Sequence, residues 1–392
     1  MVGWTAIASP GCWMALRGIK VVELAGLAPA PFCGMILSDF GANVIRVDKP
    51  TGPHIDRSGR GKRSVVIDLK KPDGINVVKR MCSKADILIE PYRPGVMEKI
   101  GLGPADLMKE NPKLIYARLT GFGQTGPYAE MAGHDINYVA ISGLLSMLGR
   151  KEGKPTPPIN LLADFAGGGL MCAFGISLAL LERSKSGLGQ VIDASMVEGA
   201  AYTGSWLYSS RDLYIWKGSR GSNWLDSGVH FYDTYETKDG KYMAVGAIEP
   251  QFYQQFITLL GLTTEEVGQL DDPDEMKKII GKSFSAKTRE EWTKVFEGKD
   301  ACVTPVLSMD EAPLHPHNVA RGSFIKASDG HFEPKPAPLL SRTPGTVIEG
   351  AIAPKVGQHT CEVLNELGYT KQEIDALLCN NVAEQLKEKA NL

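Results

Sequence analysis

Two short segments place ionisable side chains where acid–base chemistry could occur. In residues 131–138, His134 follows a glycine at an apparent helix start, and in residues 160–169, Asp164 stands at the apparent N-cap of a long helix among apolar neighbours. Imidazole and carboxyl groups are common general acids and bases. Taken singly, each has an ordinary explanation, as a helix-start histidine and as an N-cap aspartate. Only the pair is informative.

A glycine-rich run at residues 121–126 spells G-x-G-x-x-G after an expected strand, but Pro127 follows at once and no helix opens on it. The dinucleotide fingerprint requires a strand, a turn and a helix, so we interpret the run as a mobile active-site loop. The chain has no H-E-x-x-H, Cys/His cluster or G-x-S-x-G motif, and its one close pair, His315 and His317, is separated by a proline. We therefore expect neither a metal nor a redox cofactor.

The composition is that of an ordinary globular protein. A length of 392 residues predicts two domains, and the net charge of −2 gives no basic footprint for nucleic acid. The seven widely spaced cysteines, without a C-x-x-C pair, indicate reduced thiols in an intracellular protein. No apolar stretch reaches the ~20 residues of a membrane span, and residues 1–13 do not resemble a secretory signal, so we expect no membrane insertion.

The elements that must position these side chains alternate between apolar strands and amphipathic helices. Such alternation is typical of βαβ units around a largely parallel sheet. The expected strands are 21–24, 43–47, 64–69, 87–90, 115–119 and 191–194, and the expected helices include 31–40, 74–83 and 104–110. Strands at 232–236 and 241–248 form an expected hairpin.

These patterns divide the chain into five parts. We expect an N-terminal extension (1–13), a large α/β domain (14–199), a helical linker (200–228), a small α+β domain (229–320), and a return segment with C-terminal helices packing on the large domain (321–392).

Several motifs together carry a family resemblance. They are GHDINY, NLLADFAGGGL, RGKRSVVIDLK, EPYRPGVMEKIGLGP, GQVIDASMVEG and GAIEPQFY. From about Met14 to the C-terminus the chain resembles the α-methylacyl-CoA racemases of the family III CoA-transferase superfamily. The resemblance implies a Rossmann-like large domain, an interlocked homodimer, and racemisation of (2R)- and (2S)-2-methylacyl-CoA thioesters through an enolate without a cofactor.

The resemblance also implies residue roles. His134 and Asp164 would be the two bases on opposite faces of the α-carbon, and Glu249, from the other subunit, would orient His134. Backbone N–H groups near Asp135 would hold the enolate oxygen. The expected CoA and thioester contacts are Arg46, Lys49, Val66, Ile67, Asp68, Leu69, Arg93, Lys99, Gly133, Asp135, Ile136, Asn137 and Tyr138. For Arg46, a salt bridge to a neighbouring acid is an equally good explanation.

Two other functions compete. In a CoA-transferase of the same superfamily, Asp164 would attack the thioester and form an anhydride, with no need for His134. A non-catalytic CoA-binding protein would have lost one of the three catalytic positions.

The C-terminal residues Lys389, Ala390, Asn391 and Leu392 are a loose variant of a peroxisomal address. With the resemblance, they suggest a peroxisomal import receptor as partner, a peroxisomal location with a mitochondrial share, and a role in the β-oxidation of branched-chain fatty acids and bile acid intermediates.

Overall fold

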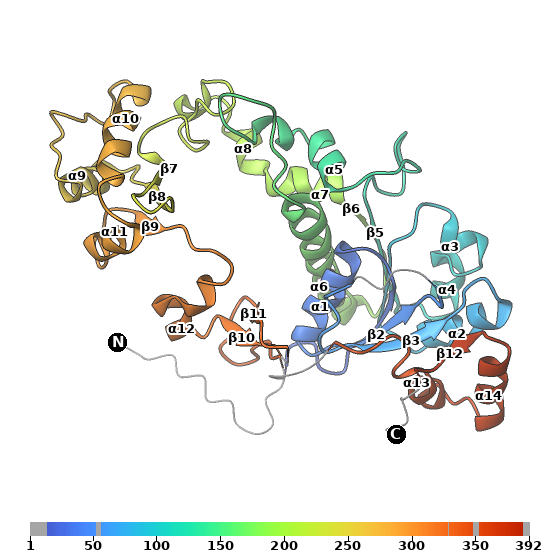
Figure 1. Ribbon diagram of the computed structural model, residues 1–392. Helices are drawn as coiled ribbons and strands as arrows, with labels where there is room; N and C mark the ends of the chain where they lie inside the picture. Colours follow the sequence, from blue (N-terminus) through green and yellow to red (C-terminus); the bar gives the residue numbers. More distant parts are fainter. Residues whose placement is uncertain (1–13, 52–55, 328, 348–352, 387–392) are drawn as a thin grey trace. The chain divides into compact units, whose positions relative to one another are not determined.

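The computed structural model describes residues 14–51, 56–327, 329–347 and 353–386 (Figure 1). The expected N-terminal extension and the C-terminal address lie outside the described residues. The chain divides into two compact units. The first contains the residues up to Ser142, Ile159–Thr203 and the residues from Val319 onward, and the second contains Gly143–Pro158 and Gly204–Asn318.

This division differs from the expected one in two places. Residues 143–158, expected inside the large domain, and residues 204–228, expected as a linker, both belong to the second unit. One reason is local pairing. The Arg150 guanidinium forms an ion pair with Asp233 and donates to Thr234 Oγ1 at 3.0 Å, so its segment is held against a strand of the second unit.

A seven-stranded sheet forms the centre of the first unit. Its strands are β1 (Lys20–Leu24), β2 (Asn43–Asp48), β3 (Arg63–Ile67), β4 (Ile87–Glu90), β5 (Ile115–Thr120), β6 (Val191–Ser195) and β12 (Ala383–Glu384). The spatial order is β12-β3-β2-β1-β4-β5-β6, and only β12 is antiparallel to its neighbour. The order 3-2-1-4-5-6 is that of a doubly wound Rossmann-like sheet, so the expected α/β fold is confirmed.

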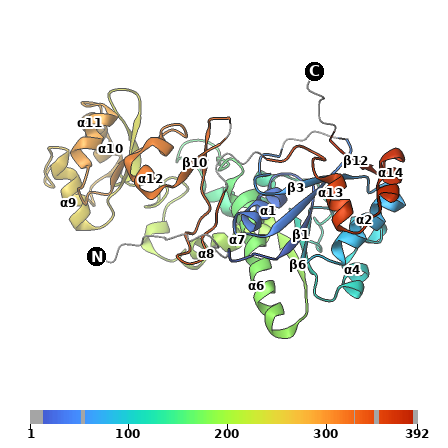
Figure 2. The same cartoon turned by 90° about the horizontal axis from the view of Figure 1, so that it is seen from below.

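Helices cover both faces of this sheet (Figure 2). One face packs against α2 (Pro72–Cys82), α3 (Val96–Lys99), α4 (Pro104–Glu110), α13 (Thr360–Glu366) and α14 (Lys371–Cys379). The remaining α-helices of this unit before the return segment are α1 (Pro29–Asp39), α5 (Asp135–Ile141), α6 (Met171–Ser186) and α7 (Met196–Thr203). The return segment contains α12 (Pro316–Arg321), β10 (Phe324–Lys326) and β11 (Phe332–Pro334).

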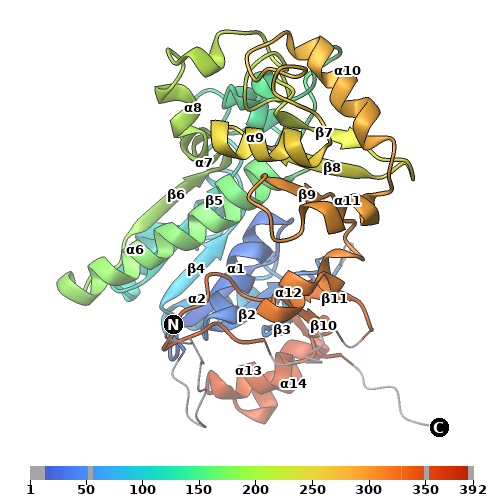
Figure 3. The same ribbon diagram turned by 90° about the vertical axis from the view of Figure 1, so that its left-hand side faces the viewer.

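The second unit has its own hydrophobic core, and Figure 3 shows its helices and strands. The sheet is β7 (Tyr232–Glu236), β8 (Tyr242–Gly246) and β9 (Val303–Pro305), and the helical elements are η1 (Leu144–Met147), α8 (Ser205–Ser209), η3 (Tyr214–Trp216), α9 (Pro250–Leu259), α10 (Pro273–Phe284), α11 (Arg289–Phe296) and η4 (Ala312–Leu314). The expected hairpin is confirmed, and β9 adds a third strand. The expected helical linker over 200–228 is not one helix, because the chain breaks into α7, α8 and η3.

The longest helical run differs from expectation in two respects. It begins with a π-helical segment, η2 (Leu161–Leu170), which continues into α6. Asp164 therefore lies inside the first turns, and Asn160, the residue directly before η2, takes the N-cap position. The combined helix Leu161–Ser186 is also long and apolar enough to cross a membrane by length and composition, although the sequence predicted no such stretch. Its Cys172, Ala173 and Ile176 are buried in the first unit, whereas several of its apolar side chains are exposed.

Candidate active site

A cavity of about 590 Å³ opens at the carboxyl ends of the parallel strands of the first unit. Its wall is formed by the residues that directly follow β1, β4, β5 and β6, together with α5 and the start of η2. The order of strands reverses between β1 and β4, which is where ligands bind in open α/β sheets. The lining residues that enter the argument below are Gly26, Lys49, Tyr92, Arg93, Gly121, Phe122, Gly133, His134, Asn137, Tyr138, Asp164 and Met196.

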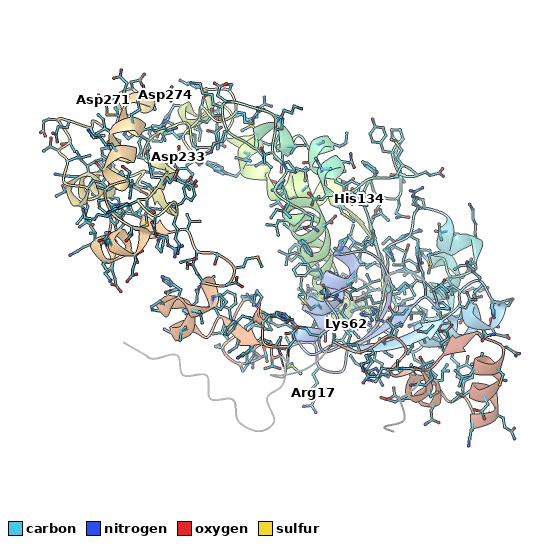
Figure 4. All side chains as sticks on the ribbon, viewed as in Figure 1. Arg17, Lys62, His134, Asp233, Asp271 and Asp274 are labelled. Atoms are coloured by element: carbon cyan, nitrogen blue, oxygen red, sulfur yellow. The ribbon has the colours of Figure 1, made fainter. Side chains whose placement is uncertain are left out.

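His134 lines this cavity from the residue before α5 and is exposed to solvent (Figure 4). Its backbone is extended, its N–H donates to Asn137 Oδ1 at 3.1 Å, and its carbonyl accepts from Asn137 N at 2.8 Å. Asn137 therefore fixes the backbone of the histidine, and His134 itself lines the cavity.

Asp164 lines the same cavity from the first turns of η2 and is partly buried. Burial raises the pKa of its carboxyl group, and the negative charge of Asp135 acts in the same direction. A hydrogen bond from Asn160 Nδ2 at 3.3 Å and the nearby His134 lower that pKa in part. The net shift is upward, so the site favours the protonated acid more than a solvated aspartate would.

Asp135, expected among the substrate contacts, does not line the cavity. Its side chain turns inward and is buried, and Oδ2 accepts from the N–H groups of Ala163 and Asp164, both at 2.8 Å. The cap of η2 is therefore provided by an aspartate 28 residues earlier, and not by Asp164 itself as the sequence predicted. The next residue, Ile136, is exposed and lies outside the cavity wall.

The Tyr138 ring is fixed between two glycines. A Cβ atom on Gly121 would stand 2.2 Å from the ring, and one on Gly133 would stand 2.7 Å from it. The hydroxyl donates to the Gly133 carbonyl, and Phe122 meets the ring edge to face at 5.0 Å. The glycine-rich run therefore serves as a close-packed wall, and no helix opens on it, as expected.

Two of the four cations expected to bind phosphate line the cavity. Lys49 follows β2, with Nζ 5.4 Å from the centre of the Tyr92 ring, and Arg93 is exposed at the rim. Arg46 is instead buried in a salt bridge, with Nε 3.0 Å from Asp48 and Nη1 2.8 Å from Asp56, which is the alternative that the sequence left open. Lys99 is exposed on α3, outside the cavity wall.

Residues 66–69, which were expected to contact the adenine of CoA, lie at the end of β3 and do not line the cavity. Val66 and Ile67 are buried, and Asp68 and Leu69 are half-buried. The Val66 N–H donates to Thr360 Oγ1 at 3.1 Å and the Asp68 N–H to the Val382 carbonyl at 2.8 Å. Because α13 and β12 occupy these donors, any adenine contact here must use other groups.

Glu249 lies in the second unit, directly before α9, and is exposed without a described side-chain cap. Among the described residues no group of three or more His, Cys, Asp or Glu side chains could hold a metal ion.

Sequence reasoning missed several wall residues that carry little chemistry of their own. Gly26 lies in the turn after β1, and Met196 is the first residue of α7, directly after β6. Tyr92 follows β4, and its N–H donates to Glu90 Oε2 at 2.7 Å. Their shared signal was position, since each comes just after a predicted strand.

The fold and site define a doubly wound α/β protein with an imidazole and a carboxyl group facing one pocket at the switch point, next to two cations. Residues 16–360 match the model of CoA-transferase family III, and the chain belongs to this family. It is 55% identical to mouse and 54% identical to human alpha-methylacyl-CoA racemase, covering 97% of this chain and all of each relative. The structure of a CAIB/BAIF family protein from Brucella suis superposes with a TM-score of 0.77 at 26% identity, covering 90% of this chain and 99% of that one.

Proposed function

We propose that this protein is a 2-methylacyl-CoA racemase that inverts the α-carbon by two-base proton transfer. The observation that carries the proposal is that His134 and Asp164 line one cavity and act on each other electrostatically. The high identity to two racemases over their whole length supports the same reaction.

Inversion requires one group to remove the α-proton from one face and another to return a proton from the other face. A neutral imidazole and a protonated carboxyl group are complementary starting states, and the raised pKa of Asp164 favours the second. Backbone N–H groups at the start of α5 would stabilise the enolate oxygen in our proposal, although the side chains of Asp135 and Ile136 do not line the cavity. His134 and Asp164 need no bound cofactor for these steps.

The thioester carries a CoA group whose phosphates need cations at the rim. Lys49 and Arg93 suit this role because they already line the cavity. Lys99 extends the basic rim in our proposal, and Arg46 would need to leave its two aspartates before it could contact phosphate.

A CoA-transferase is the competing function. There Asp164 is the nucleophile and His134 has no role, whereas this site places His134 in the same cavity as Asp164. The site therefore supports proton transfer better than carboxylate attack.

We also propose a homodimer in which Glu249 of one chain orients His134 of the other. An exposed apolar stripe supports an association surface, because Leu170, Phe174, Leu178 and Leu181 are each at least half exposed at helical spacing. The proposal extends to peroxisomal import through the C-terminus, with a mitochondrial share, and to branched-chain fatty acid and bile acid intermediates as substrates.

The deciding experiment is incubation of the protein in D₂O with a panel of single-epimer 2-methylacyl-CoA esters, without an acceptor acid. We expect deuterium at C2 and a changing epimer ratio. His134→Ala and Asp164→Ala should each abolish racemisation while CoA binding is nearly intact, although exchange from one epimer can survive. CoA transfer to an added carboxylate without C2 exchange would instead establish the transferase.

A further inference from the structure

The Asp135 carboxyl group connects the two segments that carry the proposed bases. Asp135 follows His134 directly in the chain and begins α5, and its Oδ2 accepts from the N–H groups of Ala163 and Asp164 at 2.8 Å. The side chain is 3% exposed, so water competes little for these bonds. One carboxyl group therefore fixes the backbone that carries one base relative to the backbone that carries the other.

The second oxygen of the same group is unusual. Asp135 Oδ1 is buried and has no hydrogen-bond partner among the described residues. Buried polar atoms are nearly always paired, and an unpaired one is costly, so its retention needs an explanation. A functional explanation is available, because the negative charge of Asp135 lies next to Asp164 and disfavours a second negative charge there.

We propose that Asp135 is a positioning residue of the racemase reaction, which sets the separation of His134 and Asp164 and places a carboxylate charge beside the Asp164 carboxyl group. The inference rests on the proposed function and assigns a role to the side chain, separate from that of the backbone N–H.

The surroundings of Asp164 support a specific effect. Within the described residues, the charges that act on its carboxyl group are those of Asp135 and His134, both from α5 or the residue before it. Burial raises the pKa of Tyr138, and the negative charge of Asp164 adds to this effect. Other elements packed on η2 meet it through uncharged groups, such as the Phe32 ring from α1 on Phe165 and the backbone of α7 at Gly199.

The test uses Asp135→Asn in the full chain. The amide oxygen can still accept both N–H groups, so the fold should hold, but the negative charge is gone. Without it, the pKa of Asp164 should fall. In the direction of reaction in which Asp164 returns the proton, the loss of rate at high pH should then begin at lower pH than in the wild type. Asp86→Asn is the matched control, because Asp86 also accepts a backbone N–H, from Lys20 at 2.8 Å, far from the cavity wall, and should leave the pH profile unchanged.

A second readout does not depend on activity. The difference between infrared spectra of chains with Asp164 and with Asp164→Asn reports the protonation of this one carboxyl group. The Asp164 carboxyl group should lose its proton at lower pH when Asp135→Asn is present. An unchanged titration would overturn the electrostatic part of the inference, even if the wild type failed to exchange C2 protons and the proposed function itself were wrong.

Asp135→Ala tests positioning. Loss of both hydrogen bonds should lower kcat on the order of 10²-fold, because an ångström of misplacement between reacting groups has this effect, while KM changes little. Asp135→Asn, measured at its own optimum pH, should retain most of the wild-type kcat. A lower Tm with wild-type kcat in Asp135→Ala would show a merely structural role.

Discussion

Lys62 Nζ lies 2.7 Å from Glu23 Oε2 in the interior of the first unit, with both side chains fully enclosed. The ammonium group also donates to Glu23 Oε1 at 3.0 Å and to the Pro31 carbonyl at 2.7 Å, so all three of its protons are used. The fit is close, since a Cβ atom on Gly34 would stand 1.7 Å from Glu23 Oε2. Figure 4 shows Lys62 well apart from His134.

Removing one partner of this pair should strongly destabilise the protein. Lys62→Met should lower the free energy of unfolding by roughly 3–5 kcal/mol, because it leaves a buried carboxyl group without its cation. The double variant Glu23→Gln/Lys62→Met should recover much of the loss. Urea unfolding measures both, and a single variant as stable as the wild type would contradict the pairing.

The same pair predicts a pH dependence of stability. Burial raises the pKa of Glu23 to about 7, against the partial opposing effect of Lys62. Between its ordinary value of 4.5 and about 7, the folded chain holds a proton that the unfolded chain has released. The contribution of Glu23 to stability is therefore complete below pH 4.5 and is lost as the pH rises to about 7. In urea unfolding from pH 5 to 7, the free energy of unfolding should change less with pH for Glu23→Gln than for the wild type. Glu110→Gln, at an exposed position, should keep the wild-type pH dependence.

Gly121→Ala should disrupt the pocket wall. The new methyl group would stand 2.2 Å from the Tyr138 ring, so the ring or the loop must move, at a cost of about 1–3 kcal/mol. Thermal unfolding and the KM for the thioester should both change. Gly175→Ala is the matched control, because its nearest neighbour, a methyl of Ile192, is at an ordinary 3.4 Å. If both variants behave alike, the clash is not decisive.

The apolar stripe on α6 should be the dimer surface. Phe174→Glu/Leu178→Glu should yield a monomer by analytical ultracentrifugation, and that monomer should not racemise because His134 lacks the partner's Glu249. Lys109→Glu, a charge change on the exposed side of α4, should leave the dimer intact. A fully active monomer would contradict the shared site.

Deleting Asn391 and Leu392 should leave racemisation unchanged and move a tagged protein from peroxisomes to the cytosol, because receptor-read addresses of this kind need the free C-terminus. Fluorescence microscopy of tagged full-length and shortened chains provides the measurement. A persistent punctate pattern would shift attention to residues 1–13.

The sequence by itself determined the local structure. Apolar β-branched runs predicted the six parallel strands to within about two residues, since burial on both faces of a parallel sheet demands such runs. It also predicted the hairpin at Tyr232–Glu236, and it singled out His134 and Asp164 once their motifs were taken together. These features depend on neighbours in the chain.

Only the tertiary structure decided which distant groups meet. The local pattern assigned the cap of η2 to Asp164. The side chain that accepts from the N–H groups at the start of η2 is that of Asp135, which precedes Ala163 by 28 residues. For Arg46 the sequence left phosphate contact and a salt bridge equally open, and the structure places Asp56 beside it. Residues 143–158 left the large domain because Arg150 pairs with Asp233. In each case a buried charge or an unpaired backbone group takes the nearest partner in space, and sequence distance does not reveal that partner.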